Sequence, residues 1–209
     1  MNAERWSRLA ESWSAEPNES TFTELHAAYS ESHRKYHNVA HIEDCLEQFD
    51  QATELATHPL ELETAIWFHD AIYKPMSSDN ELKSAQWAER WLVSVEAGEE
   101  PRKRVHDLIM ATLHTAADLD GDAALMVDID LSILGREPEV FARYEAAIRQ
   151  EYRWVPGPLF RRKRVEILRS FLDRPRIYVF DHFHRRYEQR ARENLERVIR
   201  NGGRWDAPE

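Results

Sequence analysis

Two adjacent residues, His69 and Asp70, have the side chains best suited to chemistry in this chain of 209 residues. They follow the segment from Leu62 to Phe68. This segment is too apolar for a helix with one solvent-exposed face, so it predicts a buried central helix. A buried imidazole beside a buried carboxylate is costly unless each is hydrogen-bonded or bound to a cation. The predicted helix holds no Lys or Arg, so a metal ion is the simplest partner for Asp70. A hydrogen-bonded histidine that caps a helix end beside a chance aspartate is the alternative.

Three further fragments contain residue types that bind metals. His37 and His41 stand four residues apart, a spacing that places both on one face if the segment is helical. Asp128 and Asp130 are carboxylates in an otherwise apolar segment. Because they are two residues apart on a predicted helix, only one of them can face a given metal. His114 lies between these fragments.

The order His, then His-Asp, then Asp resembles the HD superfamily of metal-dependent phosphohydrolases. Longer matches are Tyr-His-Asn-x-x-His-Ile at 36–42, Trp-Phe-His-Asp-Ala at 67–71, Asn-Glu-x-x-Ser-Ala at 80–85 and Tyr-Glu-x-x-Ala-Arg-x-Asn-Leu at 187–195. Together they resemble small bacterial proteins described as predicted HD-superfamily phosphohydrolases, over about residues 20–200. The resemblance implies an all-α, single-domain helical bundle of the HD-domain type over residues 1–209. Its metal-site core would span about 34–134, with C-terminal helices at about 138–201 packing on it.

The resemblance also implies a set of metal ligands: His41, His69, Asp70 and Asp130. Asp128 would then lie behind the ligands or at a solvent position. Nitrogen and oxygen ligands suit Mn, Fe, Co, Ni or Zn better than Ca, and we expect one divalent ion from this group or Mg, or two. Cys45 falls in a predicted core stripe, which leaves no thiolate for a structural zinc site.

A bound divalent ion lowers the pKa of its water and neutralises charge that develops on a phosphoryl group. The resemblance implies that this water attacks the phosphorus of a nucleotide or another small phosphorylated molecule, with Asp70 also orienting the water. Glu81 and His114 are candidate proton-transfer groups, although Glu81 could merely complement a helix dipole. Three residues are candidate phosphate contacts by position alone: Arg34, His37 and Lys74.

Two other functions stay open. Some HD-fold proteins hold two irons and activate dioxygen with additional histidines, and His106, His114 and Glu81 stand in the corresponding interval. A non-catalytic module that binds a nucleotide is the second alternative. The chain has neither a glycine-rich phosphate loop nor a serine nucleophile elbow, which excludes a P-loop NTPase and a serine hydrolase.

Charge is distributed unevenly along the chain. The net charge is −10, but residues 1–130 hold 10 Lys and Arg against 26 Asp and Glu, whereas residues 131–209 hold 18 against 12. This balance disfavours a nucleic-acid binder, and we interpret the run at 161–164 as a solvated basic face. The sequence shows no signal peptide and no apolar run of membrane-spanning length. With Cys45 as the single cysteine, we expect a cytoplasmic protein.

The composition, 42% hydrophobic and 32% charged, is that of a globular protein. Six glycines are few, and the alternation expected of strands is almost absent, so the chain is predicted to be helical throughout. The apolar periodicity predicts helices at about 4–15, 22–33, 40–56, 60–72, 80–95, 101–115, 138–152, 158–173 and 180–201, with one more around residues 128–130.

Overall fold

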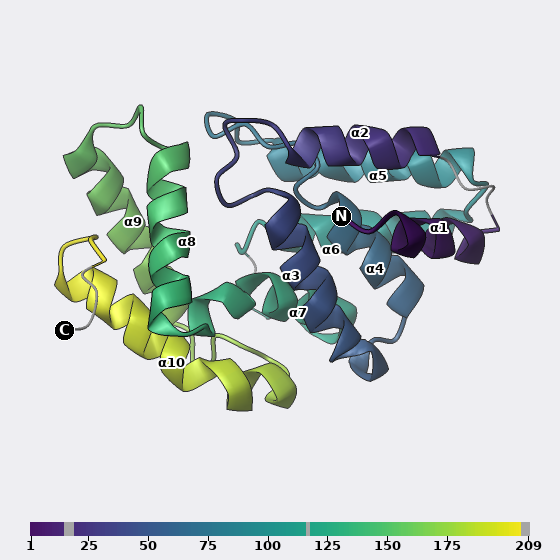
Figure 1. The fold of residues 1–209 in the computed structure, drawn as a ribbon. Helices are drawn as coiled ribbons and strands as arrows, with labels where there is room; N and C mark the ends of the chain where they lie inside the picture. The colour runs from purple at the N-terminus through teal and green to yellow at the C-terminus, as the bar shows by residue number, and fades with distance from the viewer. Residues whose placement is uncertain (15–18, 116–117, 206–209) are drawn as a thin grey trace. The chain divides into compact units, whose positions relative to one another are not determined.

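The structure is a computed structural model, and it describes residues 1–14, 19–115 and 118–205. In these ranges every regular element is a helix (Figure 1), which confirms the predicted all-α class. The elements are α1 (Ala3–Ser12), α2 (Glu19–Tyr29), α3 (Val39–Asp50), η1 (Thr53–Leu55), α4 (Pro59–Phe68), α5 (Asn80–Ser94), α6 (Glu99–Ala111), α7 (Gly121–Asp130), η2 (Leu131–Gly135), α8 (Pro138–Glu151), α9 (Gly157–Leu172) and α10 (Asp181–Arg200). No helix within the described ranges combines the length and apolar character needed to cross a membrane.

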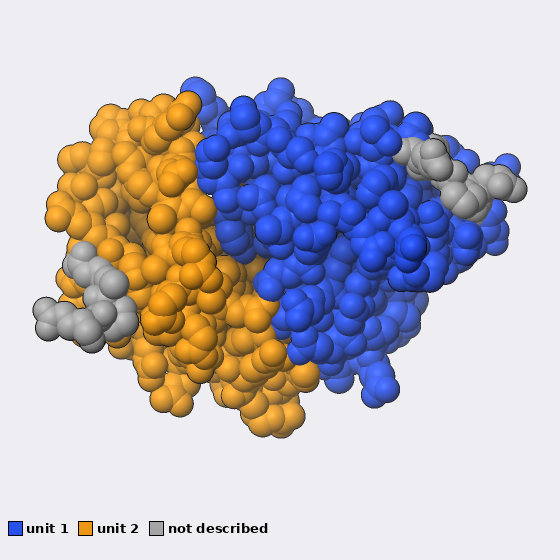
Figure 2. Space-filling model, viewed as in Figure 1, with its two compact units in different colours: residues 1–126 blue, residues 127–209 orange. Residues whose placement is uncertain are grey.

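The chain divides into two compact units, residues 1–126 and residues 127–209 (Figure 2). Helices α1 to α6 belong to the first unit, and η2 and α8 to α10 belong to the second. The boundary falls within α7, between Met126 and Val127. The single HD-type domain, in which the C-terminal helices pack on the metal-site core, stays a prediction.

Helix α4 is the centre of the first unit. It packs against α1, α3, α5 and α6, and five of its apolar side chains have no exposed surface: Leu62, Ala65, Ile66, Trp67 and Phe68. Trp6 of α1 packs on it, with its ring centroid 5.3 Å from that of Trp67 and 5.9 Å from that of Phe68. Because neighbouring helices cover α4 from several sides, it needs no polar face. The prediction of a buried central helix is confirmed.

Helix α4 ends at Phe68, one turn earlier than the sequence predicts. The backbone beyond it bonds to a side chain from another segment. Arg34 donates from Nη1 to the Asp70 carbonyl oxygen (2.6 Å) and from Nη2 to the Ala71 carbonyl oxygen (2.9 Å). These bonds replace the helical ones, so the chain turns away where His69 and Asp70 stand.

In the second unit, α10 packs against η2 and α9. Its predicted apolar stripe is buried: Phe183, Tyr187, Ala191, Leu195 and Val198. The contact with η2 depends on Gly135. A Cβ atom at this position would lie 2.5 Å from Cβ and 2.6 Å from the carbonyl oxygen of Tyr187. Only glycine therefore lets η2 approach α10 this closely.

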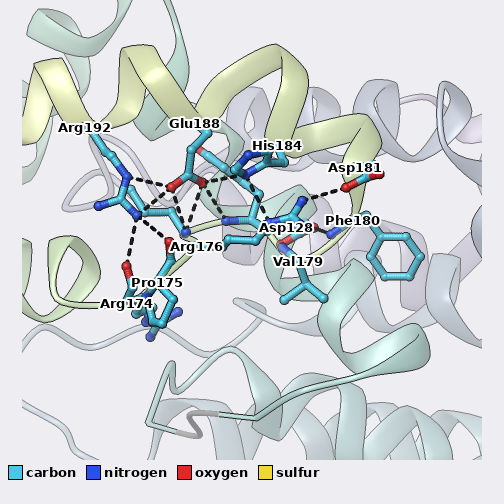
Figure 3. A network of polar contacts seen from close by, with 12 residues as sticks. Asp128, Arg174, Pro175, Arg176, Val179, Phe180, Asp181, His184, Glu188 and Arg192 are labelled. Atoms are coloured by element: carbon cyan, nitrogen blue, oxygen red, sulfur yellow. Dashed lines mark hydrogen bonds and ion pairs between the residues drawn. The ribbon is translucent and has the colours of Figure 1, made fainter.

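Two carboxylates fix the segment between α9 and α10 (Figure 3). Asp128 accepts hydrogen bonds from the backbone amides of Val179 (2.9 Å) and Phe180 (2.7 Å), and Glu188 accepts one from the amide of Ile177 (3.0 Å). Asp128 has no exposed surface, so a solvent position for it is wrong. Its burial raises the pKa of the Asp128 carboxyl to about 7, even though both amides favour the charged form.

The basic run at 161–164 is only partly the solvated face that the sequence suggests. Arg162 and Lys163 are exposed, whereas Arg161 is half-buried. Arg164 is buried, and its Nε atom donates to Oε1 of the buried Glu145 at 3.1 Å. The run therefore supplies one internal ion pair to the second unit, because a buried guanidinium requires a charged partner.

We predict that Gly135→Ala lowers the free energy of unfolding by about 1–3 kcal/mol or more, because the added methyl group meets backbone atoms of α10 that cannot move independently. Urea unfolding followed by circular dichroism measures the change. Gly157→Ala is the matched control: its Cβ would meet only the flexible end of Arg161, at 3.2 Å. We expect the control to change stability by less than about 0.5 kcal/mol. Equal effects of the two substitutions would contradict the close-approach explanation.

Candidate metal centre

His69 stands at the end of α4 with its ring orientation fixed. It is the C-cap residue, is 1% exposed, and its backbone amide donates to the Ala65 carbonyl oxygen at 2.9 Å. Its Nδ1 atom lies 2.9 Å from the carbonyl oxygen of Ile66. Because a carbonyl group only accepts, Nδ1 must carry a proton, so the ring in its neutral form would present its lone pair from Nε2. This is the arrangement that orients histidines which bind metals.

His41 comes from α3, which begins after an asparagine cap. Asn38 Oδ1 accepts from the amide of Ala40 at 2.9 Å, which starts the helix and places His41 in its first turn. The His41 side chain is 2% exposed. Its Nε2 atom lies 3.2 Å from Nε2 of His69, so two imidazole nitrogens from separate helices meet at one point.

Asp70 brings the third ligand atom to the same point. Its Oδ2 atom lies 3.3 Å from Nε2 of His69 and 3.5 Å from Nε2 of His41. Burial alone would raise the pKa of Asp70. Positive charge on His69 and His37, with hydrogen bonds from His41 and His69, holds that pKa well below its usual range. The carboxylate is therefore charged at neutral pH and can balance a cation.

The three atoms have the spacing that a metal ion requires. A triangle with edges of 3.2, 3.3 and 3.5 Å has its corners about 1.9 Å from its centre. Such a spacing would let the three side chains hold one divalent ion at the usual length of metal bonds to histidine and carboxylate, about 2.0–2.2 Å. Within the first unit, the structure thus brings together three of the four predicted ligands, His41, His69 and Asp70.

Asp130 is the fourth predicted ligand. It is the last residue of α7, directly before η2, and its side chain is half-buried. It belongs to the second unit, whereas the other three belong to the first. Its role as a ligand stays a prediction.

Cys45 is a candidate ligand that the sequence reasoning missed. It is buried one helical turn after His41, and its Sγ atom lies 3.8 Å from Nδ1 and 3.9 Å from Nε2 of that ring. Cys45, His41 and His69 each offer a ligand atom within 4.8 Å of the others. These buried residues could hold a metal ion, so a thiolate ligand is available after all. The spacing of His41 and Cys45, four residues apart on a predicted helix, is the signal that could have found it.

Arg34 holds the backbone around the centre. It is 4% exposed, and besides the carbonyl groups of Asp70 and Ala71 its Nη1 atom donates to the carbonyl oxygen of His37 (3.1 Å). Its Nε atom donates to Glu31 at 3.0 Å. A phosphate group would have to compete with these bonds. The geometry favours a positioning role for Arg34, and its predicted phosphate contact stays a prediction.

The other predicted site residues lie around the same turn or farther along the chain. His37 is half-buried, with its ring stacked on Tyr73 at a centroid distance of 4.2 Å. Lys74 is exposed and follows Tyr73 directly. Glu81 is half-buried in the first turn of α5, and His114 follows α6 with a left-handed backbone (φ 56°). The roles of these four residues stay predictions.

Comparison of the chain with protein-family models, curated proteins and solved structures finds no match. What the centre does must therefore be argued from its own atoms.

We predict that His41→Gln and His69→Gln each lower the bound metal at least about tenfold, because each removes one of the nitrogens that converge. Metal content is measured by mass spectrometry after dialysis against Mn or Zn. His106→Gln is the matched control, since His106 is a half-buried histidine of α6 whose Nδ1 atom lies 3.4 Å from Oδ1 of the neighbouring Asp107. In the same assay, Cys45→Ser should weaken Zn binding more than Mn binding if the thiolate is a ligand. Metal content that persists in both glutamine variants would contradict the site.

We further predict that Arg34→Lys destabilises the protein by about 2–4 kcal/mol, because lysine leaves buried carbonyl oxygens without donors. The same substitution should weaken metal binding about 10- to 100-fold by releasing the turn that holds Asp70. Thermal unfolding of the metal-free chain and metal titration measure the two effects separately. Arg90→Lys, at an exposed position of α5, serves as the control. An Arg34 variant that behaves like this control would show that the hydrogen bonds of Arg34 have no influence on the centre.

Proposed function

We propose that the protein is a metal-dependent phosphohydrolase of the HD superfamily, which acts on a nucleotide or another small phosphorylated molecule. The observation that supports this proposal is the convergence of His41 Nε2, His69 Nε2 and Asp70 Oδ2 around one point. The Nδ1 proton of His69 is held by Ile66, so that its ring presents a lone pair there. A cytoplasmic setting, in which the single buried thiol stays reduced, belongs to the same proposal.

The protein side chains have distinct tasks in this proposal. A divalent ion, when bound, supplies an activated water and neutralises charge on a phosphoryl group. His41 and His69 bind that ion, and Asp70 contributes the negative charge that balances it. The ionised Asp70 can also accept a hydrogen bond from the attacking water and so orient it. Arg34 keeps Asp70 in place by holding its carbonyl group.

His41, His69 and Asp70 would hold the ion, and a catalytic site would also need a coordination position for water or substrate. Asp130 is the proposed fourth ligand. Beside the centre, His37 and Lys74 are proposed to meet the phosphate, and Glu81 and His114 are proposed to transfer protons. Each of these assignments comes from the resemblance or from position in the chain.

The direct test is phosphate release from nucleoside monophosphates, nucleoside diphosphates and phosphodiesters, with added Mn, Co or Ni and with a chelator. We expect release that depends on the metal. Stoichiometric metal binding without turnover of any substrate would instead favour the non-catalytic nucleotide-binding module. Two equivalents of iron with a visible absorption band would favour the di-iron oxygenase.

We predict that Asp70→Ala removes both metal binding and activity, because it removes a ligand and the balancing charge. Glu81→Gln and His114→Gln should keep the metal yet lower turnover about 10²- to 10⁴-fold and flatten one limb of the pH profile, because they remove proton-transfer groups. Metal stoichiometry and steady-state kinetics separate the two outcomes. Glu89→Gln, at an exposed position of α5, is the control. Unchanged turnover in both glutamine variants would return Glu81 to a helix-dipole role and His114 to a structural one.

A further inference from the structure

The second unit contains a pocket of about 310 Å³ that has no part in the proposed metal chemistry. This volume lies at the lower end of the range of about 300–1,000 Å³ for pockets that bind small molecules. It suits one ligand of the size of a mononucleotide. The side chains that define its chemistry come from α8, α9 and the segment after α10: Glu145, Arg149, Phe160, Arg161, Arg204 and Trp205.

Two consecutive glycines bring the last of these residues to the pocket. Gly202 and Gly203 both have left-handed backbones, with φ of 61° and 83°. A Cβ atom on Gly203 would lie only 2.7 Å from the carbonyl oxygen of Arg161. Glycine therefore allows the chain to reverse after α10 and to lie directly on α9. This reversal places Arg204 and Trp205 in the pocket wall.

The aromatic part of the wall is held by packing. The ring of Trp205 meets that of Phe141 edge to face, with centroids 5.0 Å apart, and the guanidinium carbon of Arg197 lies 5.2 Å from its centroid. Phe160 is covered in the same way by Arg149, at 4.8 Å. Because the half-buried ring of Trp205 is already ordered, a flat ligand that stacks on it would cost little conformational entropy.

The polar part of the wall has a surplus of positive charge. Glu145 is the single acidic residue of the lining, and Arg164 already neutralises it with hydrogen bonds to both carboxylate oxygens. Arg149 is fixed by two backbone carbonyl groups, at 2.6 and 3.2 Å. Arg161 and Arg204 have no acidic partner within the described ranges of the chain. Three arginines therefore line the pocket without a carboxylate of their own.

We propose that this pocket binds a small organic phosphate that carries a flat ring, with the size and chemistry of a nucleoside monophosphate. Guanidinium groups form paired, charge-assisted hydrogen bonds with phosphate, which selects an anion. Aromatic side chains stack with nucleobases, which selects a ring. The proposal stands apart from the proposed phosphohydrolase activity, because every lining residue belongs to the second unit and no metal is required.

The test is calorimetric titration of adenosine monophosphate into the full chain in the presence of a chelator. We expect one equivalent to bind, with an affinity that falls as salt is added. Arg161→Gln and Arg204→Gln should each weaken binding at least about tenfold through loss of a charged hydrogen bond. Arg162→Gln is the matched control, because Arg162 is the next residue of α9 but is exposed and outside the lining. The control should bind like the unaltered chain.

Additional ligands and variants identify what is recognised and where. Adenosine and inorganic phosphate should each bind more weakly than the monophosphate, and Trp205→Leu should remove most of the advantage of the ring. Asp70→Ala should bind the nucleotide normally, because its position lies in the first unit. The proposal is overturned if the unaltered chain does not bind, if Arg162→Gln loses as much affinity as Arg161→Gln, or if inorganic phosphate binds as tightly as the nucleotide. Loss of binding in Asp70→Ala would also overturn it, by locating the nucleotide at the metal centre.

Discussion

The candidate centre depends on how the buried end of α4 satisfies its backbone carbonyl groups. A helix leaves its last carbonyl groups without helical donors, and water cannot serve them in a core. Here side chains do so: Nδ1 of His69 bonds to the carbonyl of Ile66, the hydroxyl of Tyr29 to that of Trp67 at 3.0 Å, and Arg34 to those beyond. The hydrogen bonds that satisfy these buried carbonyl groups therefore also orient the His69 ring and hold the turn at Asp70. The same atoms stabilise the fold and position the candidate ligands.

Local patterns in the sequence were sufficient to predict the helices and the residue types of the centre. Apolar periodicity predicts helices close to those observed, because each helix buries one face and that face repeats along the chain. The end of α4 was not predictable, since it is set by Arg34, which is 36 residues from Asp70 in the chain. Cys45 was assigned to the core because a buried thiol and a liganding thiol have the same periodicity. The adjacent His69 and Asp70 were recognisable because burial makes such a pair costly without a partner.

Contacts between distant segments explain what the sequence could not predict in the second unit. In the sequence, Asp128 is a polar residue in an apolar helix. In the structure it accepts hydrogen bonds from two amides of a segment about fifty residues later, one of them that of Phe180 (Figure 3). The pocket likewise depends on the approach of Gly203 to Arg161. The apolar periodicity of the sequence does not indicate that a glycine is needed for a contact with a residue 42 positions away. Such positions become visible only when both partners are seen together.

The packing of Trp6 has a spectroscopic consequence. Its ring centroid lies 5.3 Å from that of Trp67 and 5.0 Å from that of Trp91, so three indole chromophores are held in a fixed asymmetric cluster around α4. Near-ultraviolet circular dichroism depends on such fixed packing and disappears when it loosens. Trp154, by contrast, is 54% exposed in the second unit, where its emission reports mainly on water. The indole cluster therefore gives an optical signal from the half that holds His41 and His69, to which the packed ring of Trp205 adds one from the second unit.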